Sequence, residues 1–313
     1  MIPVLDSRNY LARLLAAKRP GVDAVLAYYE YRVGAIVKDG SLMLAPLDDH
    51  MFHRGDGVFE SMKFAEGRLY QFEEHMARLR RSAESICLEP PCPWSDVRTA
   101  ALETTRAAGA AIGHLRLFLG RGPGSFGVDP LESPQSSFYA VVTRFTPQPL
   151  SWYEKGLTAF RARMPARPAC FSHIKDVNYL NAVFMVMEGR KNRKDIPLCF
   201  DAEGHLAESA VANVCLVDKE GALVVPEFTH ALPGTTILRA VELVRDRLAC
   251  VTRPIPEAEI FEASELLLLG TSPGCVPLVE YEGRQIGSGE RGPVARLIND
   301  LLDEDLRLSG LLF

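Results

Sequence analysis

The chain has 313 residues, of which 47% are hydrophobic and 24% are charged, a composition typical of a folded globular protein and not of a disordered one. This length allows one large domain or two medium domains, and it buries a core without help from disulfides or a metal. The formal net charge of −5 comes from 35 Lys and Arg against 40 Asp and Glu, so no basic surplus is available to bind nucleic acid.

The helices and strands predicted from hydrophobic periodicity and turn residues alternate along the chain. They are helix 1–20, short strands within 24–47 with a hairpin at Asp39-Gly40, strand 59–64, helix 72–87, helix 95–111 capped by Ser95, strands 115–119 and 138–143, strand 157–163, helix 176–194, strands 198–201, 205–208, 213–217 and 222–225, helix 236–249, strands 251–255 and 265–269, and helix 293–306.

This order predicts an α+β / α/β fold in two domains. We expect residues 1–22 to form a helical extension outside the main fold. A small α/β domain then covers 23–145, and a proline-containing linker covers 146–152. Residues 153–313 form a larger domain of mixed strands with helices.

The cysteines and the absence of apolar runs predict a cytoplasmic protein. The seven cysteines are an odd number, and no pair has the spacing Cys-x-x-Cys. We therefore expect reduced thiols, with no metal site and no redox dithiol. No apolar run is long enough for a signal peptide or a membrane span, so we expect no membrane partner.

Two weak motifs are better explained without a ligand. The run Gly122-Pro-Gly-Ser-Phe-Gly127 matches a dinucleotide-binding fingerprint, but the prolines that follow prevent the helix that such a site needs, so we expect a flexible loop. The hypothesis of a nicotinamide-dependent oxidoreductase depends on this loop alone. The pair His50 and His53 lacks an obvious third metal ligand, and we interpret it as surface histidines.

Five further segments are more informative together than singly. In chain order they are His53-Arg54-Gly55-Asp56-Gly57-Val58-Phe59-Glu60, His75-Met-Ala-Arg78-Leu79, Ile174-Lys175-Asp-Val-Asn178-Tyr179-Leu180-Asn181, Ala207-Glu208-Ser-Ala-Val-Ala-Asn213-Val214, and Leu232-Pro233-Gly234-Thr235-Thr236 followed later by Gly270-Thr271-Ser272. Their order and spacing resemble the fold-type IV, class IV aminotransferases, which use pyridoxal 5′-phosphate (PLP). That family includes branched-chain aminotransferases, D-amino-acid aminotransferases and aminodeoxychorismate lyase.

The resemblance implies the catalytic and ring-binding residues. Lys175 matches the lysine that forms the Schiff base with PLP, and its apolar neighbours are expected to bury it and so favour the neutral amine. Glu208 matches the carboxylate that faces the pyridine nitrogen. Tyr179 matches the tyrosine at the 3′-oxygen, and Leu232 matches the residue packed on the ring.

The resemblance also implies a phosphate site. Arg78 matches the family arginine and can grip a phosphate with two parallel hydrogen bonds. Thr235 and Thr236 open a predicted helix, whose free amide groups favour an anion, and Thr271 adds a hydroxyl.

On the substrate side, the resemblance points to Phe59, Arg116, Ser272 and Arg54. Arg116 lies in a predicted strand, and we expect it to help anchor a carboxylate. Arg54 stands where relatives often carry an aromatic residue. Bacterial D-amino-acid aminotransferases carry an Arg-x-His pair in the loop where this chain has Ser125-Phe-Gly127. Branched-chain enzymes have one more residue between the lysine and the tyrosine.

The resemblance implies transfer of an amino group from an amino acid, of branched-chain or D-amino-acid type, to a 2-oxo acid. The alternative is a PLP-dependent 4-amino-4-deoxychorismate lyase, which shares every cofactor residue. A non-catalytic PLP-binding protein is a further alternative, although no core motif is missing. A homodimer is expected because relatives build each pocket with a loop from the partner.

Overall fold

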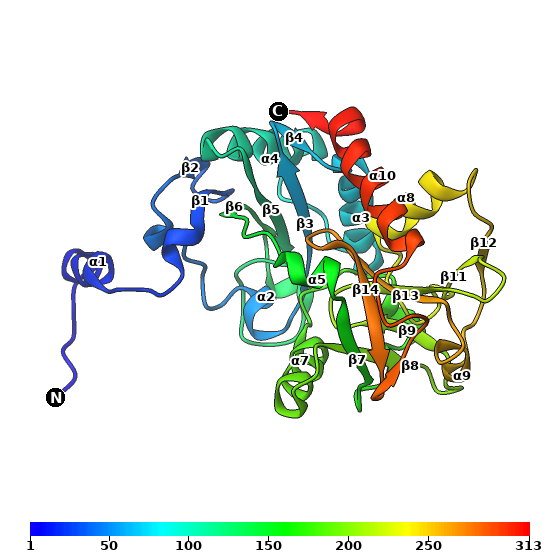
Figure 1. Cartoon of the computed structure of the whole chain (residues 1–313). Helices are drawn as coiled ribbons and strands as arrows, with labels where there is room; N and C mark the ends of the chain where they lie inside the picture. Colours follow the sequence, from blue (N-terminus) through cyan, green and yellow to red (C-terminus); the bar gives the residue numbers. More distant parts are fainter.

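The computed structural model describes residues 1–313 and contains two β-sheets (Figure 1). The first sheet has seven strands, all paired antiparallel with their neighbours. Their order across the sheet is β16 (Leu311–Leu312), β4 (Arg68–Leu69), β3 (Gly57–Ala65), β5 (Ile112–Gly120), β6 (Ser137–Arg144), β1 (Val25–Glu30) and β2 (Ala35–Val37). The end of the chain therefore returns to the sheet that its first half builds.

The second sheet has nine strands and mixes parallel with antiparallel pairs. Its order is β12 (Cys250–Thr252), β11 (Leu223–Val225), β10 (Asn213–Val217), β13 (Glu265–Gly270), β14 (Gly274–Tyr281), β7 (Leu157–Arg161), β8 (Ile196–Phe200) and β9 (Leu206–Ser209), with β15 (Arg284–Gln285) beside β14. Because β9 also pairs with β10, the strands from β10 through β9 form a closed ring. This ring surrounds a core of buried apolar side chains, aromatic as well as aliphatic.

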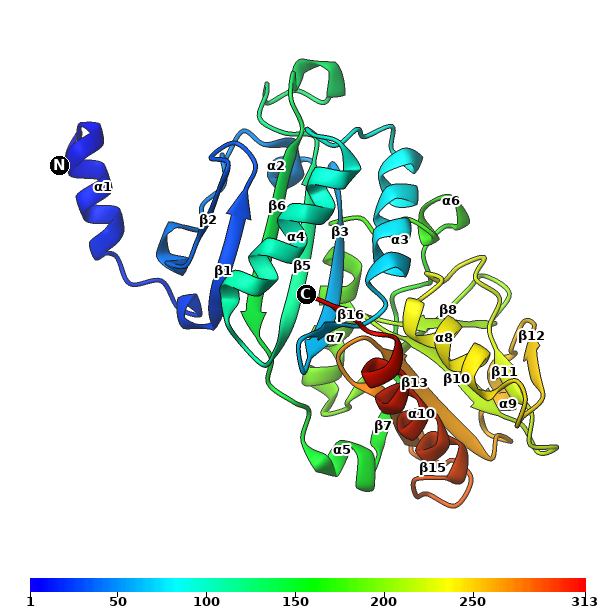
Figure 2. The ribbon, with the colours of Figure 1, turned by 90° about the horizontal axis from the view of Figure 1, so that it is seen from above.

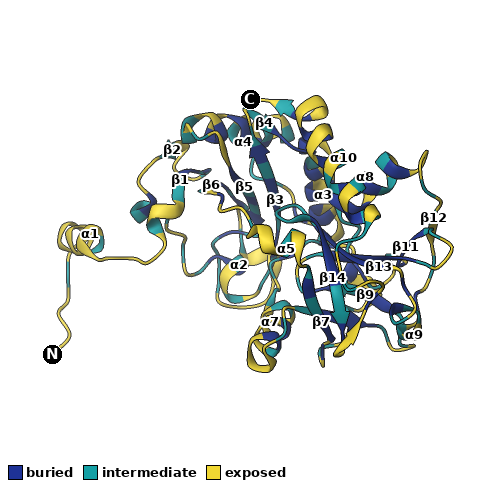
Figure 3. Ribbon diagram, viewed as in Figure 1, coloured by how far each residue is buried: buried dark blue, intermediate teal, exposed yellow.

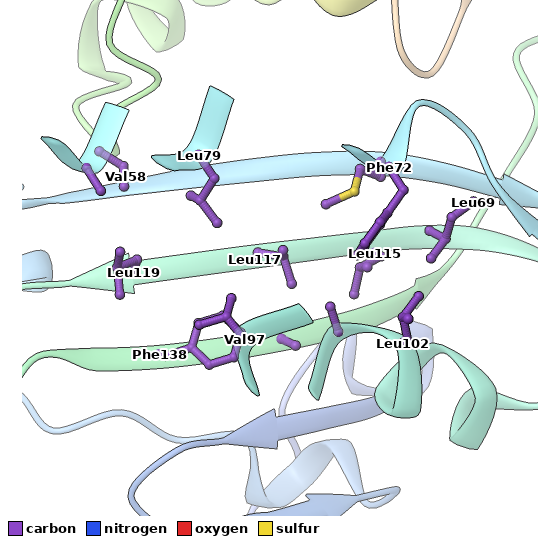
Figure 4. Close-up of a cluster of buried hydrophobic side chains, with 14 of the residues drawn as sticks. Val58, Leu69, Phe72, Leu79, Val97, Leu102, Leu115, Leu117, Leu119 and Phe138 are labelled. Carbon is purple, nitrogen blue, oxygen red and sulfur yellow. The ribbon is translucent and has the colours of Figure 1, made fainter. Parts of the chain in front are cut away.

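Two helices, α3 (Phe72–Ser85) and α4 (Trp94–Ala108), cover one face of the first sheet (Figure 2). Strand alternation sends every second side chain of β3, β5 and β6 toward these helices. The result is a buried cluster in which Val58, Leu117 and Phe138 from the strands meet Leu79 and Val97 from the helices (Figure 4).

The second sheet is covered by α8 (Thr235–Val244) and α10 (Pro293–Ser309). Ile237 and Val244 of α8 and Ile298 of α10 pack with strand residues of this sheet in one buried cluster. Tyr70, which follows β4 of the first sheet, belongs to the same cluster, and its hydroxyl donates to Asp305 of α10 at 2.8 Å. The two sheets therefore share buried contacts.

The remaining helices are short or lie at the surface. They are α1 (Ser7–Ala16), α2 (His50–His53), α5 (Leu150–Glu154), α6 (Ala169–Ser172), α7 (Leu180–Asn192) and α9 (Glu257–Ile260). None of the residues of α1 is buried, and this helix stands away from both sheets (Figure 3). None of the helices combines the length and the apolar character needed to cross a membrane.

Several predicted elements need correction. Asp39-Gly40 does not turn a hairpin: the turn lies at residues 31–34, and Asp39 instead caps a short 3₁₀ helix. Ser95 is not the cap of α4, which begins after Pro93. The strand β14 was not predicted, because Pro277 interrupts its hydrophobic pattern. The domain boundaries stay a prediction. The structure shows that β16, at the end of the predicted larger domain, pairs with β4 of the first sheet.

The core of the first sheet generates a test of its stability. Leu117 is fully buried, so Leu117→Ala should lower the free energy of unfolding by about 2–5 kcal/mol, because it removes apolar contacts and leaves a cavity. Leu308 of α10 is 75% exposed, and Leu308→Ala is the matched control, with an expected change within about 0.5 kcal/mol. Urea unfolding measures both, and equal losses would contradict the assigned core.

Candidate active site

The segment that carries Lys175 is held by main-chain hydrogen bonds to the first sheet. The amide of Phe59 donates to the carbonyl of Lys175 at 2.9 Å, and the amide of Val177 donates to the carbonyl of Gly57 at 3.0 Å. The Lys175 amide donates to Ser82 Oγ of α3 at 3.1 Å. This pairing keeps the backbone extended, so α7 begins at Leu180 and not at residue 176 as predicted.

The Lys175 side chain lies in a cavity that we call the Lys175 cavity, which Tyr179, Glu208 and Leu232 also line. Its Nζ donates to the Tyr179 hydroxyl at 3.1 Å and lies 4.6 Å from the centre of the Phe59 ring. The predicted burial by flanking apolar residues is wrong in part, because Phe171 and Leu180 are 53% and 62% exposed. Of the flanking residues, Ile174 and Tyr179 do line the cavity. The rest of the wall includes residues of α7, of β9 and the turn after it, and Leu232, and Phe59 lies beside the amine.

Glu208 lines the same cavity as Lys175 and lies on β9 at its pairing with β10. Its Oε2 accepts a hydrogen bond from the Leu232 amide at 3.1 Å. Loss of hydration on burial raises the pKa of Glu208 to about 7, and the Leu232 amide and the positive charge of Lys175 only partly oppose this rise. A cationic partner in the cavity would restore the carboxylate form.

Hydroxyl groups gather at the amino end of α8. Thr236, Thr271 and Ser272 line a second cavity of about 440 Å³, which we call the Thr236 cavity. The cap residue of α8 is Gly234, and no side chain accepts from the amides of the first turn. Free amides and hydroxyls at a helix start form a favourable environment for an anion.

Arg78 reaches the same helix from the first sheet's side. Its Nε and Nη2 donate to the two carboxylate oxygens of Glu60 at 2.7 and 2.8 Å, and its Nη1 donates to the Pro233 carbonyl at 3.3 Å. The two-bond grip of Arg78 on a phosphate stays a prediction, and it would have to use Nη1 and the outer hydrogen of Nη2. Glu60 occupies its Nε–Nη2 edge, and Nη1 retains a hydrogen for another acceptor.

The Glu60 carboxylate also binds His75. Its Oε2 lies 2.6 Å from His75 Nδ1, and the other ring nitrogen of His75 lies 3.2 Å from Thr235 Oγ1. Burial would raise the pKa of Glu60, but Arg78 and His75 outweigh that effect and lower the pKa to about 2. Burial lowers the pKa of His75 and so favours its neutral form. Thr235 thus points to His75 and does not line the Thr236 cavity.

Sequence reasoning missed Glu60, His75 and Ser82 as site residues, although each carried a signal. His75, Arg78 and Ser82 follow one another at spacings of three and four, so they share the buried side of α3 with Leu79. Glu60 occupies an alternate position of β3 between buried apolar residues, where an acid needs a partner.

The predicted substrate residues divide into two groups. Phe59 stacks near Lys175, and Arg116 lies on the same face of the first sheet, donating to Thr143 Oγ1 at 2.9 Å. No carboxylate accepts from Arg116, and burial lowers its pKa. Ser272 Oγ lies 3.0 Å from His114 Nε2, and burial, with help from Arg116, lowers the pKa of His114 to about 4.

Arg54 lies outside both cavities. Its guanidinium donates to the carbonyls of His53, Phe126 and Gly127, so it binds the glycine-rich loop. That loop opens no α-helix, which agrees with the rejection of a dinucleotide site. The interpretation of His50 as a surface residue is wrong, since it is buried and its Nε2 lies 3.0 Å from the Ser125 carbonyl.

Comparison with known sequences identifies the family. The family described as amino-transferase class IV matches residues 57–281, which span both sheets. A D-amino-acid transaminase, chloroplastic, from Arabidopsis thaliana is 31% identical, over 98% of this chain and 83% of the relative. A putative branched-chain-amino-acid aminotransferase from Methanocaldococcus jannaschii is 27% identical, over 80% of this chain and 88% of the relative.

Solved structures show the same fold. A branched-chain amino acid aminotransferase from T.th., in complex with pyridoxamine 5′-phosphate, has a TM-score of 0.85 at 23% identity, covering 90% of this chain and 94% of the other. The enzyme from Escherichia coli has a TM-score of 0.82 at 21% identity, covering 88% and 93%. This chain belongs to the class IV aminotransferase family. It is an aminotransferase, and the predicted fold-type IV architecture is confirmed.

Glu208 generates a pH-dependent test of the Lys175 cavity. Its pKa in the folded chain is about 7, above the ordinary 4.5, so the folded state binds more protons than the unfolded state between these values. The free energy of unfolding should therefore fall as the pH rises from about 4.5 through 7. Glu208→Gln removes this titration. From pH 5 to pH 8, the free energy of unfolding of the wild type should therefore fall by about 2–3 kcal/mol relative to that of Glu208→Gln.

The measurement is urea unfolding of cofactor-free protein at pH 5 and pH 8. Glu203 lies in the turn before β9 and is exposed, so Glu203→Gln is the control. Its free energy of unfolding should depend on pH as that of the wild type does. If the free energy of unfolding changes with pH equally in Glu208→Gln and the wild type, the raised pKa of Glu208 is contradicted.

Proposed function

We propose that this aminotransferase binds PLP at Lys175 and moves an amino group from an amino acid, of branched-chain or D-amino-acid type, to a 2-oxo acid. The observation that carries the proposal is the Lys175 cavity, where an amine, a phenol and a buried carboxyl face one space. The T.th. relative has been solved with pyridoxamine 5′-phosphate and with N-(5′-phosphopyridoxyl)-L-glutamate, and these complexes support the choice of cofactor.

The residues of the site fit PLP at both ends of that molecule. Glu208 would face the pyridine nitrogen, because a buried carboxyl whose pKa is about 7 gains a charge-balancing partner there. Leu232 would pack on the ring, since it lines the same cavity. Arg78 Nη1, the first amides of α8, and the hydroxyls of Thr236 and Thr271 would receive the phosphate. When bound, PLP supplies an electron sink for the substrate carbon.

Each protein residue then has a defined task. Lys175 would hold PLP through its amine and would move a proton at the substrate Cα. Tyr179 orients Lys175 through the bond at 3.1 Å and would place its hydroxyl at the 3′-oxygen of the ring. Thr235 supplies its backbone amide, since its hydroxyl is directed to His75.

The substrate groups would lie over the face of the first sheet that carries Phe59 and Arg116. Arg116 lacks an anionic partner, so a substrate carboxylate would satisfy it, directly or through its loop. Ser272, fixed by His114, would bound the pocket on the side of the second sheet. Arg54 would act indirectly, by holding the loop at residues 122–128.

The alternative is a PLP-dependent 4-amino-4-deoxychorismate lyase with the same cofactor residues. The relatives' names give it no additional support. The products separate the two reactions: the lyase releases pyruvate from aminodeoxychorismate, whereas the transaminase transfers an amino group to 2-oxoglutarate. We place the protein in the cytoplasm because all seven cysteines are free thiols.

We also propose a homodimer. On α7, Leu180, Val183, Phe184 and Met187 form an exposed apolar stripe at helical spacing. The loop after β5 adds Phe126, which is 63% exposed. Apolar surface of this kind is typical of a face that another chain covers.

Replacing Lys175 tests the proposed chemistry. Lys175→Ala should reduce amino transfer below detection and remove the absorbance band near the visible edge, because no other amine lines the cavity to hold PLP. Lys191, at the exposed end of α7, provides the control Lys191→Ala, which should keep both. Adding single D- and L-amino acids to the wild type should collapse the band with one stereochemical class. A band that persists in Lys175→Ala overturns the assignment.

The oligomeric state is tested by light scattering. The wild type should have twice the chain mass of 34.6 kDa. Phe184→Glu should shift the protein toward monomer by placing a charge in the apolar stripe, while Leu308→Glu, at an exposed position of α10, should leave the mass unchanged. A monomeric wild type would contradict the proposed dimer.

A further inference from the structure

The Glu60 carboxylate joins residues that come from both sheets. Glu60 is fully buried on β3, on the face opposite to Phe59, so it does not line the Lys175 cavity. Its oxygens contact Arg78 and His75 of α3, while Arg78 and His75 in turn contact Pro233 and Thr235 at the start of α8. One carboxylate therefore connects the first sheet's helix with the first turn of the second sheet's helix.

The hydrogen-bond directions in this group follow from the charge of Glu60. Because the neighbouring Arg78 keeps the pKa of Glu60 low and the group ionised, its oxygens can only accept hydrogen bonds. His75 must then carry its hydrogen on Nδ1, which leaves Nε2 to accept from the Thr235 hydroxyl. Arg78 is fixed through Nε and Nη2, so only Nη1 and the outer hydrogen of Nη2 remain to face an anion.

We propose that Glu60 is the positioning residue of the phosphate site: it fixes the direction of Arg78 and, through His75 and Thr235, the place of the first turn of α8. This inference rests on the proposed binding of PLP. Glu60 does not touch the cofactor in this assignment, and its effect passes through the residues that do.

The proposal and simple electrostatics predict opposite results for Glu60→Gln. Removing a negative charge beside Arg78 would, by charge alone, strengthen the binding of a phosphate dianion. A positioning role predicts the reverse, because glutamine has a single accepting oxygen where Glu60 has two. Its NH2 group would face a donor, either Arg78 Nε or the pair Arg78 Nη2 and His75 Nδ1, so the two-bond contact with Arg78 is lost. Arg78 is then no longer held in one direction, so phosphate binding has to order its side chain, and the lost entropy weakens binding.

The experiment compares PLP with pyridoxal, which lacks the phosphate group. The holoenzyme is diluted in series, and the cofactor retained is read from its visible absorbance, which gives a dissociation constant. The same protein reloaded with pyridoxal gives a second constant, and their ratio measures the contribution of the phosphate. Glu60→Gln should weaken PLP binding by about 10- to 100-fold and leave pyridoxal binding nearly unchanged.

Glu84→Gln is the matched control. It removes one negative charge from the same helix as Arg78, but Glu84 is exposed and lies outside the network. Its PLP-to-pyridoxal ratio should equal that of the wild type. If Glu60 acts through Arg78, adding Glu60→Gln to Arg78→Ala should raise the dissociation constant of PLP by less than about threefold more.

The possible results separate the two proposals. A wild type that binds neither PLP nor pyridoxal overturns the proposed function, whereas a wild type that binds both while Glu60→Gln binds PLP equally well or more tightly overturns only the positioning role. Equal losses for PLP and pyridoxal also overturn it, since they indicate a general structural defect. If Glu60→Gln does not fold, His75→Gln is measured, and an unchanged ratio there overturns the link to α8.

Discussion

The buried carboxylate of Glu60 is the charge around which the two halves of the site are arranged. A carboxylate without water is costly unless positive or donor groups surround it, and here the guanidinium of Arg78 and the imidazole of His75 do so. Satisfying that one anion fixes two side chains of α3 and directs them toward the start of α8. The proposed phosphate site thus depends on a group that would not touch the phosphate.

Strand alternation separates the contacts of Glu60 from the Lys175 cavity. Adjacent residues of β3 point to opposite faces of the first sheet, so Phe59 contacts the Lys175 side chain while Glu60 faces α3. The same strand also pairs with the main chain around Lys175. One strand therefore sets the position of the Lys175 main chain and, on its other face, the orientation of Arg78.

The second sheet contributes the groups whose chemistry depends on burial. Loss of hydration raises the pKa of Glu208 to about 7, and this residue lies where β9 meets β10 in the closed ring. The first turn of α8 and the Thr271 segment add donors from the same sheet. Family membership follows from the match across both sheets, and the arrangement of Lys175, Tyr179 and Glu208 in one cavity gives it a chemical basis.

The sequence by itself determined the class of fold, the helices with strong periodicity, and the five segments from which the site is built. These features are local: α3 and α8 follow from apolar spacing, and the Thr235-Thr236 pair opens a helix as predicted. Tertiary structure alone decided that Lys175 sits in an extended segment, that Arg54 binds a loop, and that Glu60 occupies one edge of Arg78. Each of these depends on contacts between residues far apart in the chain, and no local pattern encodes which partner a buried charge will find.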